Sequence, residues 1–366
     1  MTECPEFLKP RLRLFLSADI IGSTALKQSK LGVSDGNVAG TVWFTAIQGF
    51  YFEAKQKFQA AWGRAKSASA DEGYFGPAPE LWKTIGDEVL FTKLITDHRQ
   101  VAITLQCWME TLESIRGFLS KEKRRLGVKS TAWIAGFSYR NKEVVLSGEA
   151  FSSDGLIDDY YSENGKILNK YYTDSKSNVN IDYIGPHIDT GFRLTGHATA
   201  RKFIVSLDVA YIMSLTSQTK SSPIEAINLR YDGQVFLKGV LGGTSYPLFW
   251  LDLANKDSSS VLEDKLTKEA PCNRDDVQAF CEAFYEQHSE LIFPPFVESE
   301  TENTLTVKPG WYSRDHDALI KSFIESQKDI PEPVPEETEV TDDVFNEMKQ
   351  GMLDALPGKA EGEHRV

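Results

Sequence analysis

The feature that most constrains the fold is a set of apolar strands that end in turns carrying an aspartate. Residues 12–19, LRLFLSAD, alternate and are followed by IIGST, which predicts a buried strand that ends in a turn. Residues 81–91, LWKTIGDEVLF, predict two further strands joined by a tight turn at Gly86 and Asp87. We therefore expect a core built around a sheet, with Asp19 and Asp87 at strand ends.

Helical patterns alternate with strand patterns over the first 250 or so residues. Apolar residues at helical spacing predict a long helix between positions 42 and 58, and small polar residues predict a loop over 66–79. Residues 138–180 predict a hairpin plus an irregular insertion. Further helices are predicted at 97–126, 189–202 and 208–215, and further strands at 130–137, 203–206, 230–238 and 245–251. This order favours an α+β sandwich of a mainly antiparallel sheet with helices over a doubly wound parallel sheet.

The composition changes after residue 252. Residues 260–326 predict one or two amphipathic helices with a break at Pro294 and Pro295. From Pro331 onward ten carboxylates face three Lys or Arg, which accounts for seven of the 13 net negative charges. We therefore predict three regions: a main domain at 1–255, with an insertion at about 138–180, a helical extension at 256–328, and an acidic, disordered tail at 329–366.

Composition excludes several classes of function. With 53 acidic against 40 basic residues, the chain lacks the surplus of cations that a general nucleic-acid binder needs. No apolar run approaches the about 20 residues that span a bilayer, and the amino terminus has no signal-peptide pattern. The four cysteines form no CxxC pair, and no P-loop motif occurs. We expect a cytoplasmic protein that binds neither membrane nor nucleic acid.

The two strand-end aspartates are the residues most indicative of chemistry. Two carboxylates that converge on one spot suit a pair of hard cations such as Mg²⁺ or Mn²⁺. Gly22, Ser23 and Thr24 follow Asp19 and offer backbone N–H groups to phosphate oxygens at a helix start. Taken alone, Asp19 is equally an ordinary turn residue and Asp87 an ordinary hairpin residue.

Four motifs in order resemble those of the class III nucleotidyl cyclases, which make cyclic nucleotides from nucleoside triphosphates. The first, Asp-Ile-x-Gly-(Ser/Phe)-Thr, is matched by residues 19–24, and the second, Lys-x-x-Gly-Asp, by residues 83–87. The third, Asp-x-x-Gly-x-x-(Val/Ile)-Asn-x-x-x-Arg, is approximated by residues 182–193. The fourth, a Lys-Gly hairpin followed by an apolar strand, is matched by residues 237–240 and 245–251. The resemblance covers about residues 12–252 and implies a class III cyclase domain that works as a homodimer with shared active sites.

The resemblance also implies roles for individual residues. Asp19, Ile20 and Asp87 are expected to hold two Mg²⁺ or Mn²⁺ ions per site. Arg193 is expected to neutralise charge on the α-phosphate, with Asp189 where the family has a ribose-orienting Asn. Contacts to the nucleoside triphosphate are expected from the remaining motif residues, Gly22, Ser23, Thr24, Lys83, Asp182 and Lys238. Without the motifs, Arg193 would be a surface arginine with Asp189 at i−4, and Lys238 a solvated hairpin lysine.

The base is the open question. A Lys83 donor beside an Asp182 acceptor complements adenine, cytosine and uracil alike, so hydrogen bonding does not decide. Tyr51 is a candidate for shortening the base pocket, or else an ordinary core residue. In organisation the chain most resembles the stand-alone cyclases of Pycsar anti-phage defence, which make cyclic UMP or cyclic CMP for a separate effector. We expect UTP in preference to CTP, with an adenylate cyclase or an inactive regulatory or dimerisation module as alternatives.

Overall fold

The computed structural model describes residues 4–28, 42–69, 75–121, 126–146, 160–174, 179–216, 229–253, 258–268, 270–297 and 308–328. Seven strands form one sheet in the order β2-β3-β1-β4-β7-β9-β8. Their bounds are β1 (Arg11–Ile21), β2 (Glu80–Ile85), β3 (Glu88–Ile95), β4 (Gly127–Phe137), β7 (Lys202–Val205), β8 (Leu229–Val235) and β9 (Tyr246–Asp252). Among the described strands only β4 and β7 pair in parallel. The predicted α+β fold with a mainly antiparallel sheet is confirmed.

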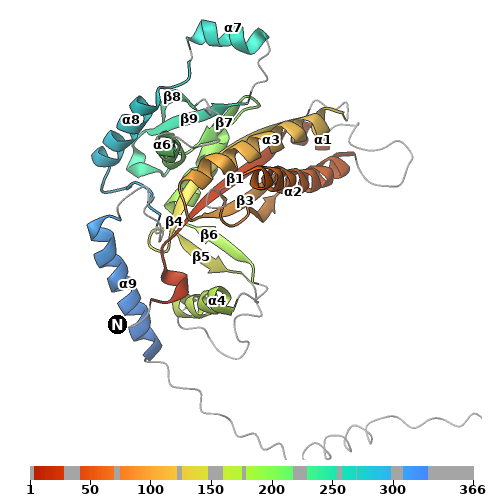
Figure 1. The fold of residues 1–366 in the computed structure, drawn as a ribbon. Coiled ribbons are helices and arrows are strands. Elements are labelled where there is room, and N and C mark those ends of the chain that lie inside the picture. Colours follow the sequence, from red (N-terminus) through yellow and green to blue (C-terminus); the bar gives the residue numbers. More distant parts are fainter. Residues whose placement is uncertain are drawn as a thin grey trace, which may run out of the picture. The chain divides into compact units, whose positions relative to one another are not determined.

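The sheet has a hydrophobic cluster on each face, and the residues of the central strand β1 alternate between the two. Its even-numbered residues, such as Leu14 and Leu16, are fully buried in the large core with α2 (Val42–Ala68), α3 (Arg99–Lys121) and α6 (Leu207–Thr216). Figure 1 shows α2 and α3 running along this face of the sheet. Its odd-numbered residues face the opposite way, where Phe15 packs with Trp133 and Tyr183 in a second cluster. Asp19 is odd-numbered and therefore lies on this second face.

The second face is covered by the insertion and the segment after it. β5 (Lys142–Val145) pairs with β6 (Ile181–Ile184) in a separate two-stranded sheet. The helix α5 (Pro186–Leu194) then packs Ile188 into the Phe15 cluster. The predicted helix at 189–202 is wrong in its bounds. α5 begins earlier, since Pro186 suits a first turn, and it passes into a short 3₁₀ turn at Thr195–His197.

The predicted irregular insertion contains regular structure. α4 (Tyr160–Asp174) lies within it and buries Leu168 against Phe7 and Phe323. Residues 147–159 and 175–178 of the same insertion lie outside the described residues.

Among the described residues after the sheet, the chain forms the helices α7 (Ser258–Thr267), α8 (Arg274–Gln287) and α9 (Gly310–Lys328). α8 buries Val277, Cys281, Phe284 and Tyr285 in the large core. The chain divides into two compact units, Met1–Phe323 and Ile324–Val366. The domain boundary that the sequence predicts at residue 255 stays a prediction. The predicted acidic tail, 329–366, lies outside the described residues.

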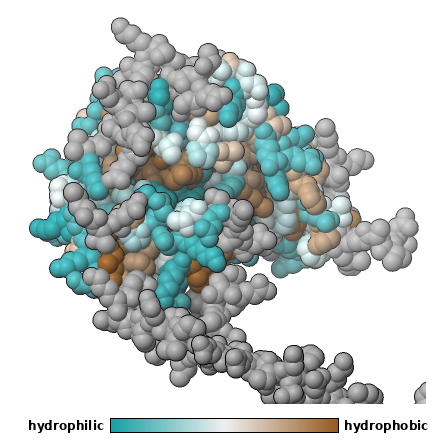
Figure 2. Space-filling view, turned by 60° about the horizontal axis from the view of Figure 1, so that its bottom comes forward, coloured by the Kyte–Doolittle hydropathy of each residue, from teal (hydrophilic) through white to brown (hydrophobic). Residues whose placement is uncertain are grey.

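The surface seen in Figure 2 carries separate hydrophobic patches among hydrophilic residues. Large apolar side chains remain exposed on β2, where Leu81 and Ile85 lie on the edge strand, and on β6, where Ile184 does. In the part of the chain that the structure describes, no helix combines the length and apolarity needed to cross a membrane.

Candidate active site

Asp19 lies near the end of β1, in a row of charged residues that crosses three strands. The strand register places Asp19 opposite Glu88 on β3 and opposite Lys129 on β4. Directly paired residues point to the same face of a sheet, so the three side chains are neighbours. The Lys129 Nζ atom lies 3.1 Å from Asp19 Oδ2, with both side chains about three-quarters buried.

Asp87 is brought to the same place by the turn between β2 and β3. Gly86 adopts φ +65°, which favours glycine, and lets the chain reverse direction. The Ile20 N–H donates to the Asp87 carbonyl at 3.3 Å, so the turn lies directly beside the end of β1. The Asp87 carboxylate accepts a hydrogen bond from the Ser23 hydroxyl and lies 3.2 Å from Lys27 Nζ. The structure therefore brings Asp19 and Asp87 together, as the sequence led us to expect, and places Ile20 and Ser23 beside them.

The site concentrates negative charge. Burial raises the pKa of Asp19, Lys129 opposes that rise, and the nearby Asp87 charge adds to it. Burial also raises the pKa of Glu88, against a hydrogen bond with Ser17. One Glu88 oxygen, Oε1, is buried without a hydrogen-bond partner. Three carboxylates with two lysines as counter-charges form an environment that favours added cations.

These residues fit a divalent cation. Within the described residues, no group of three or more His, Cys, Asp or Glu side chains is arranged to hold a metal ion. Mg²⁺, however, is usually bound by one or two carboxylates together with substrate phosphates. Asp19 and Asp87 supply such a pair of carboxylates. Each already forms an ion pair with a cation, Asp19 with Lys129 and Asp87 with Lys27.

Sequence reasoning missed Glu88, Lys129 and Lys27 at this site. Glu88 directly follows Asp87, but its position opposite Asp19 depends on the strand register. Lys129 likewise requires the pairing of β1 with β4.

The phosphate-binding candidates lie at a tight turn. Gly22 has φ +89°, and α1 (Ser23–Gln28) begins directly after it. Gly22 and Thr24 are exposed, whereas Ser23 is buried with its hydroxyl on Asp87. Gly22 and Thr24 are therefore accessible to a ligand, and Ser23 instead holds the aspartate.

Lys83 and Asp182, 99 positions apart, form an ion pair. The Lys83 Nζ atom, on β2, donates to Asp182 Oδ1, on β6, at 2.7 Å. The Tyr183 N–H donates to the same oxygen at 3.0 Å. Both residues line an open cavity of about 390 Å³ whose walls include Trp82 and Tyr171. The structure thus joins the two predicted base-reading residues at a cavity with aromatic walls.

The remaining predicted residues do not join these clusters. Asp189 and Arg193 are exposed on α5, and Lys238 is exposed after β8. Arg193 makes no ion pair with Asp189, nor with any other residue that the structure describes. Tyr51 on α2 donates its hydroxyl proton to the Gly86 carbonyl and is absent from the cavity beside Lys83. Its role in base selection stays a prediction.

No family model matches the chain, and no curated protein matches it. Among solved structures it is similar to adenylyl cyclase CyaB from P. aeruginosa, with 10% identity and a TM-score of 0.44 over 68% of this chain and 97% of that chain. It is also similar to the guanylate cyclase domain of RhGC from Catenaria anguillulae in complex with GTP, with 13% identity and a TM-score of 0.39 over 66% and 97% of the two chains. For the guanylyl cyclase Cya2 the identity is 10% and the TM-score 0.38, over 68% and 96%.

Proposed function

We propose that this chain is a nucleotidyl cyclase that converts a pyrimidine nucleoside triphosphate, UTP in preference to CTP, to the 3′,5′-cyclic monophosphate and pyrophosphate. The observation that carries the proposal is the convergence of Asp19 and Asp87 at one end of the sheet, beside an exposed glycine turn. The four cyclase-like motifs and the Lys83–Asp182 pair support it.

In this proposal Asp19, Asp87 and the Ile20 carbonyl would hold two Mg²⁺ or Mn²⁺ ions. Ions bound there supply positive charge that lowers the pKa of the ribose 3′-hydroxyl and neutralises the triphosphate. The chain's own contribution is to fix the carboxylates. The Ser23 hydroxyl orients Asp87, and Lys129 orients Asp19. The exposed backbone at Gly22 accommodates phosphate oxygens at the start of α1.

The site is completed by a second copy of the chain. Arg193 and Lys238 are exposed and make no contact with Asp19 or Asp87 within one chain. In a homodimer, Arg193 of the second copy neutralises charge on the α-phosphate, and its Lys238 binds the outer phosphates. Asp189 lies one turn before Arg193 on α5, and in this proposal it orients the ribose. Exposed Leu81, Ile85 and Ile184 near the base cavity supply apolar surface for such an interface.

The base lies in the cavity beside Lys83 and Asp182. In the absence of a ligand, the two side chains neutralise each other at 2.7 Å. A base that enters between them receives a hydrogen bond from Lys83 and donates one to Asp182. Uracil does so through O4 and N3–H. Cytosine and adenine present a similar pattern, cytosine through N3 and N4 and adenine through N1 and its amino group, so an adenylate cyclase remains the alternative to the pyrimidine assignment.

We further propose that the product acts as a second messenger in anti-phage defence. A separate effector would bind the cyclic nucleotide in the cytoplasm. This part of the proposal rests on the resemblance to stand-alone cyclases alone.

The metal-site part is tested with amide variants. Asp19→Asn and Asp87→Asn should each abolish measurable pyrophosphate release from UTP in the presence of Mn²⁺. Mn²⁺ binding, followed by electron paramagnetic resonance, should weaken in parallel. The matched control is Asp275→Asn, an exposed carboxylate in the first turn of α8, which should change neither. Turnover close to that of the unmodified chain in either site variant would contradict the proposal.

A further inference from the structure

A second cavity, of about 120 Å³, lies at the end of the sheet opposite Asp19. β1 and β4 pair Arg11 with Phe137 at this end and Asp19 with Lys129 at the other. Eight residues of strand separate the two ends, which is about 27 Å. The cavity is therefore distinct from the proposed catalytic site.

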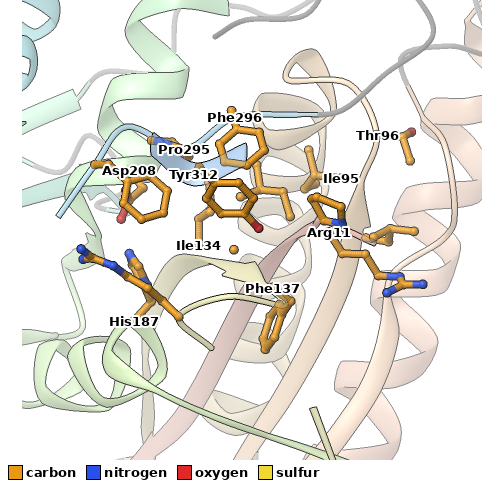
Figure 3. A pocket seen from close by; sticks show the side chains of 16 residues that line it. Arg11, Ile95, Thr96, Ile134, Phe137, His187, Asp208, Pro295, Phe296 and Tyr312 are labelled. Carbon is orange, nitrogen blue, oxygen red and sulfur yellow. The ribbon is translucent and has the colours of Figure 1, made fainter. Parts of the chain in front are cut away.

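Apolar groups from several elements line most of this cavity. The floor comes from the sheet, including Ile134 and Phe137, and the cover comes from Pro295, Phe296 and Tyr312. Figure 3 shows the rings of Phe296 and Tyr312 side by side over Ile134, with Asp208 and His187 on one side. In another protein, an engineered apolar cavity of about 150 Å³ binds benzene. This cavity is somewhat smaller but is partly open to solvent, so a ligand with one ring can enter it and project from its open side.

The cavity wall contains a buried carboxyl group, that of Asp208, whose nearest basic partner in the described residues is His187, which lowers its pKa against the effect of burial. Asp208, at the start of α6, is 8% exposed. Its Oδ1 accepts a hydrogen bond from the Tyr285 hydroxyl at 2.8 Å, and it forms no ion pair with a described residue. A buried carboxylate without a cation is costly, and burial raises the pKa of Asp208 accordingly.

None of the three basic residues that line the same cavity forms an ion pair with Asp208. Arg11 donates to the Lys9 carbonyl at 3.2 Å and lies 3.7 Å from the centre of the Tyr172 ring. Arg140 donates to the Leu291 carbonyl and lies over the Phe293 ring. Burial lowers the pKa of His187, against a smaller rise caused by the Asp208 charge, and the net effect favours the neutral ring. The Nδ1 atom of His187 lies 3.0 Å from the Asn141 amide nitrogen.

We propose that this cavity binds a small organic cation, an ammonium group carried on a single aromatic ring or a group of similar size. The ammonium pairs with the ionised form of Asp208, a charge-assisted hydrogen bond that the neutral His187 ring does not supply. The ring packs between Ile134 and the rings of Phe296 and Tyr312, which also attract cations through their faces.

The test compares two probes of nearly equal shape on the full chain, benzylamine, which is cationic at pH 7, and neutral benzyl alcohol. Isothermal titration calorimetry should show benzylamine binding at least tenfold more tightly than benzyl alcohol. Asp208→Asn keeps an acceptor for Tyr285 and removes the charge. It should weaken benzylamine binding at least tenfold and leave benzyl alcohol binding unchanged. Asp275→Asn, an exposed carboxylate on α8, is the matched control and should alter neither affinity.

A second variant fills the space instead of removing the charge. Gly136 lines the cavity, and a Cβ added there meets only Leu12 Cδ1, at 3.9 Å. We expect the larger side chain of Gly136→Val to take up cavity volume. It should abolish binding of both probes. Equal affinity for the two probes, no binding of benzylamine at millimolar concentration, or full binding by Gly136→Val would overturn the proposal. None of these results depends on cyclase activity.

Discussion

Gly191 offers a test of how α5 is held against the sheet. This helix carries Asp189 and Arg193. Its Gly191 packs directly against the indole ring of Trp133, which is fully buried. A Cβ added at Gly191 would lie 2.2 Å from Trp133 Cδ2, 2.3 Å from Cε2 and 2.5 Å from Cγ. Carbon atoms in ordinary contact are about 3.5–4.0 Å apart. Gly191→Ala must therefore displace α5 or the indole by more than about 1 Å.

The size of the effect follows from that displacement. Overpacking of a tight core costs about 1–3 kcal/mol, and the better helix propensity of alanine offsets up to about 1 kcal/mol. We expect Gly191→Ala to lower the free energy of unfolding by about 1–2 kcal/mol, measured by urea denaturation. A misplacement of about 1 Å can cost about 100-fold in rate. Since α5 carries Arg193, we expect cyclisation of UTP to fall by about that factor, much more than the loss of stability explains.

Gly196→Ala is the matched control. Gly196 lies in the 3₁₀ turn directly after α5, and a Cβ there meets nothing within 4 Å. The Gly196→Ala protein should have the same free energy of unfolding and the same turnover as the unmodified chain. If Gly191→Ala also retained full stability and activity, the close packing of α5 on Trp133 would not position Arg193, and the reasoning would be refuted.

Three further predictions concern other parts of the molecule. Burial lowers the pKa of Lys93 from 10.5 to about 7, so above pH 7 the native chain loses a proton that the unfolded chain keeps. The free energy of unfolding should therefore rise between pH 7 and 9, and Lys93→Met should flatten that rise when both proteins are unfolded in urea. Asp19→Ala and Arg193→Ala proteins, each inactive, should regain cyclase activity when mixed under conditions of verified subunit exchange; continued inactivity would argue against a shared site. Tyr51→Ala should raise turnover of ATP relative to UTP in an equimolar competition assay, whereas an unchanged ratio would leave Tyr51 only its contact with the Gly86 carbonyl.

Local patterns predicted the part of the fold that holds the metal candidates. The alternation over residues 12–19 and the Gly86–Asp87 turn specify β1 and the β2–β3 hairpin without reference to distant residues. The convergence of Asp19 and Asp87 follows from those two elements and the antiparallel register. Lys83 and Asp182 lie on separate sheets, and only the resemblance to known cyclases predicted that they act together.

Features that depend on several distant elements were not predictable. α4 has a polar sequence, and its buried Leu168 is recognised only with Phe7 and Phe323 in place. Glu88 needed the strand register, since its sequence neighbours suggest only a hairpin residue. The cavity beside Asp208 combines residues from strands and helices between positions 10 and 312, so no local pattern indicates it.

The central claim is that the chain forms a cyclic nucleotide from a nucleoside triphosphate. The most direct measurement incubates the purified full chain with Mn²⁺ and each of ATP, GTP, CTP and UTP separately, and identifies the products by mass spectrometry. We predict 3′,5′-cyclic UMP and pyrophosphate from UTP as the main reaction, a smaller yield of cyclic CMP, and none without divalent metal. Cyclic AMP as the main product would contradict the pyrimidine assignment, and no cyclic nucleotide from any of the four would contradict the account as a whole.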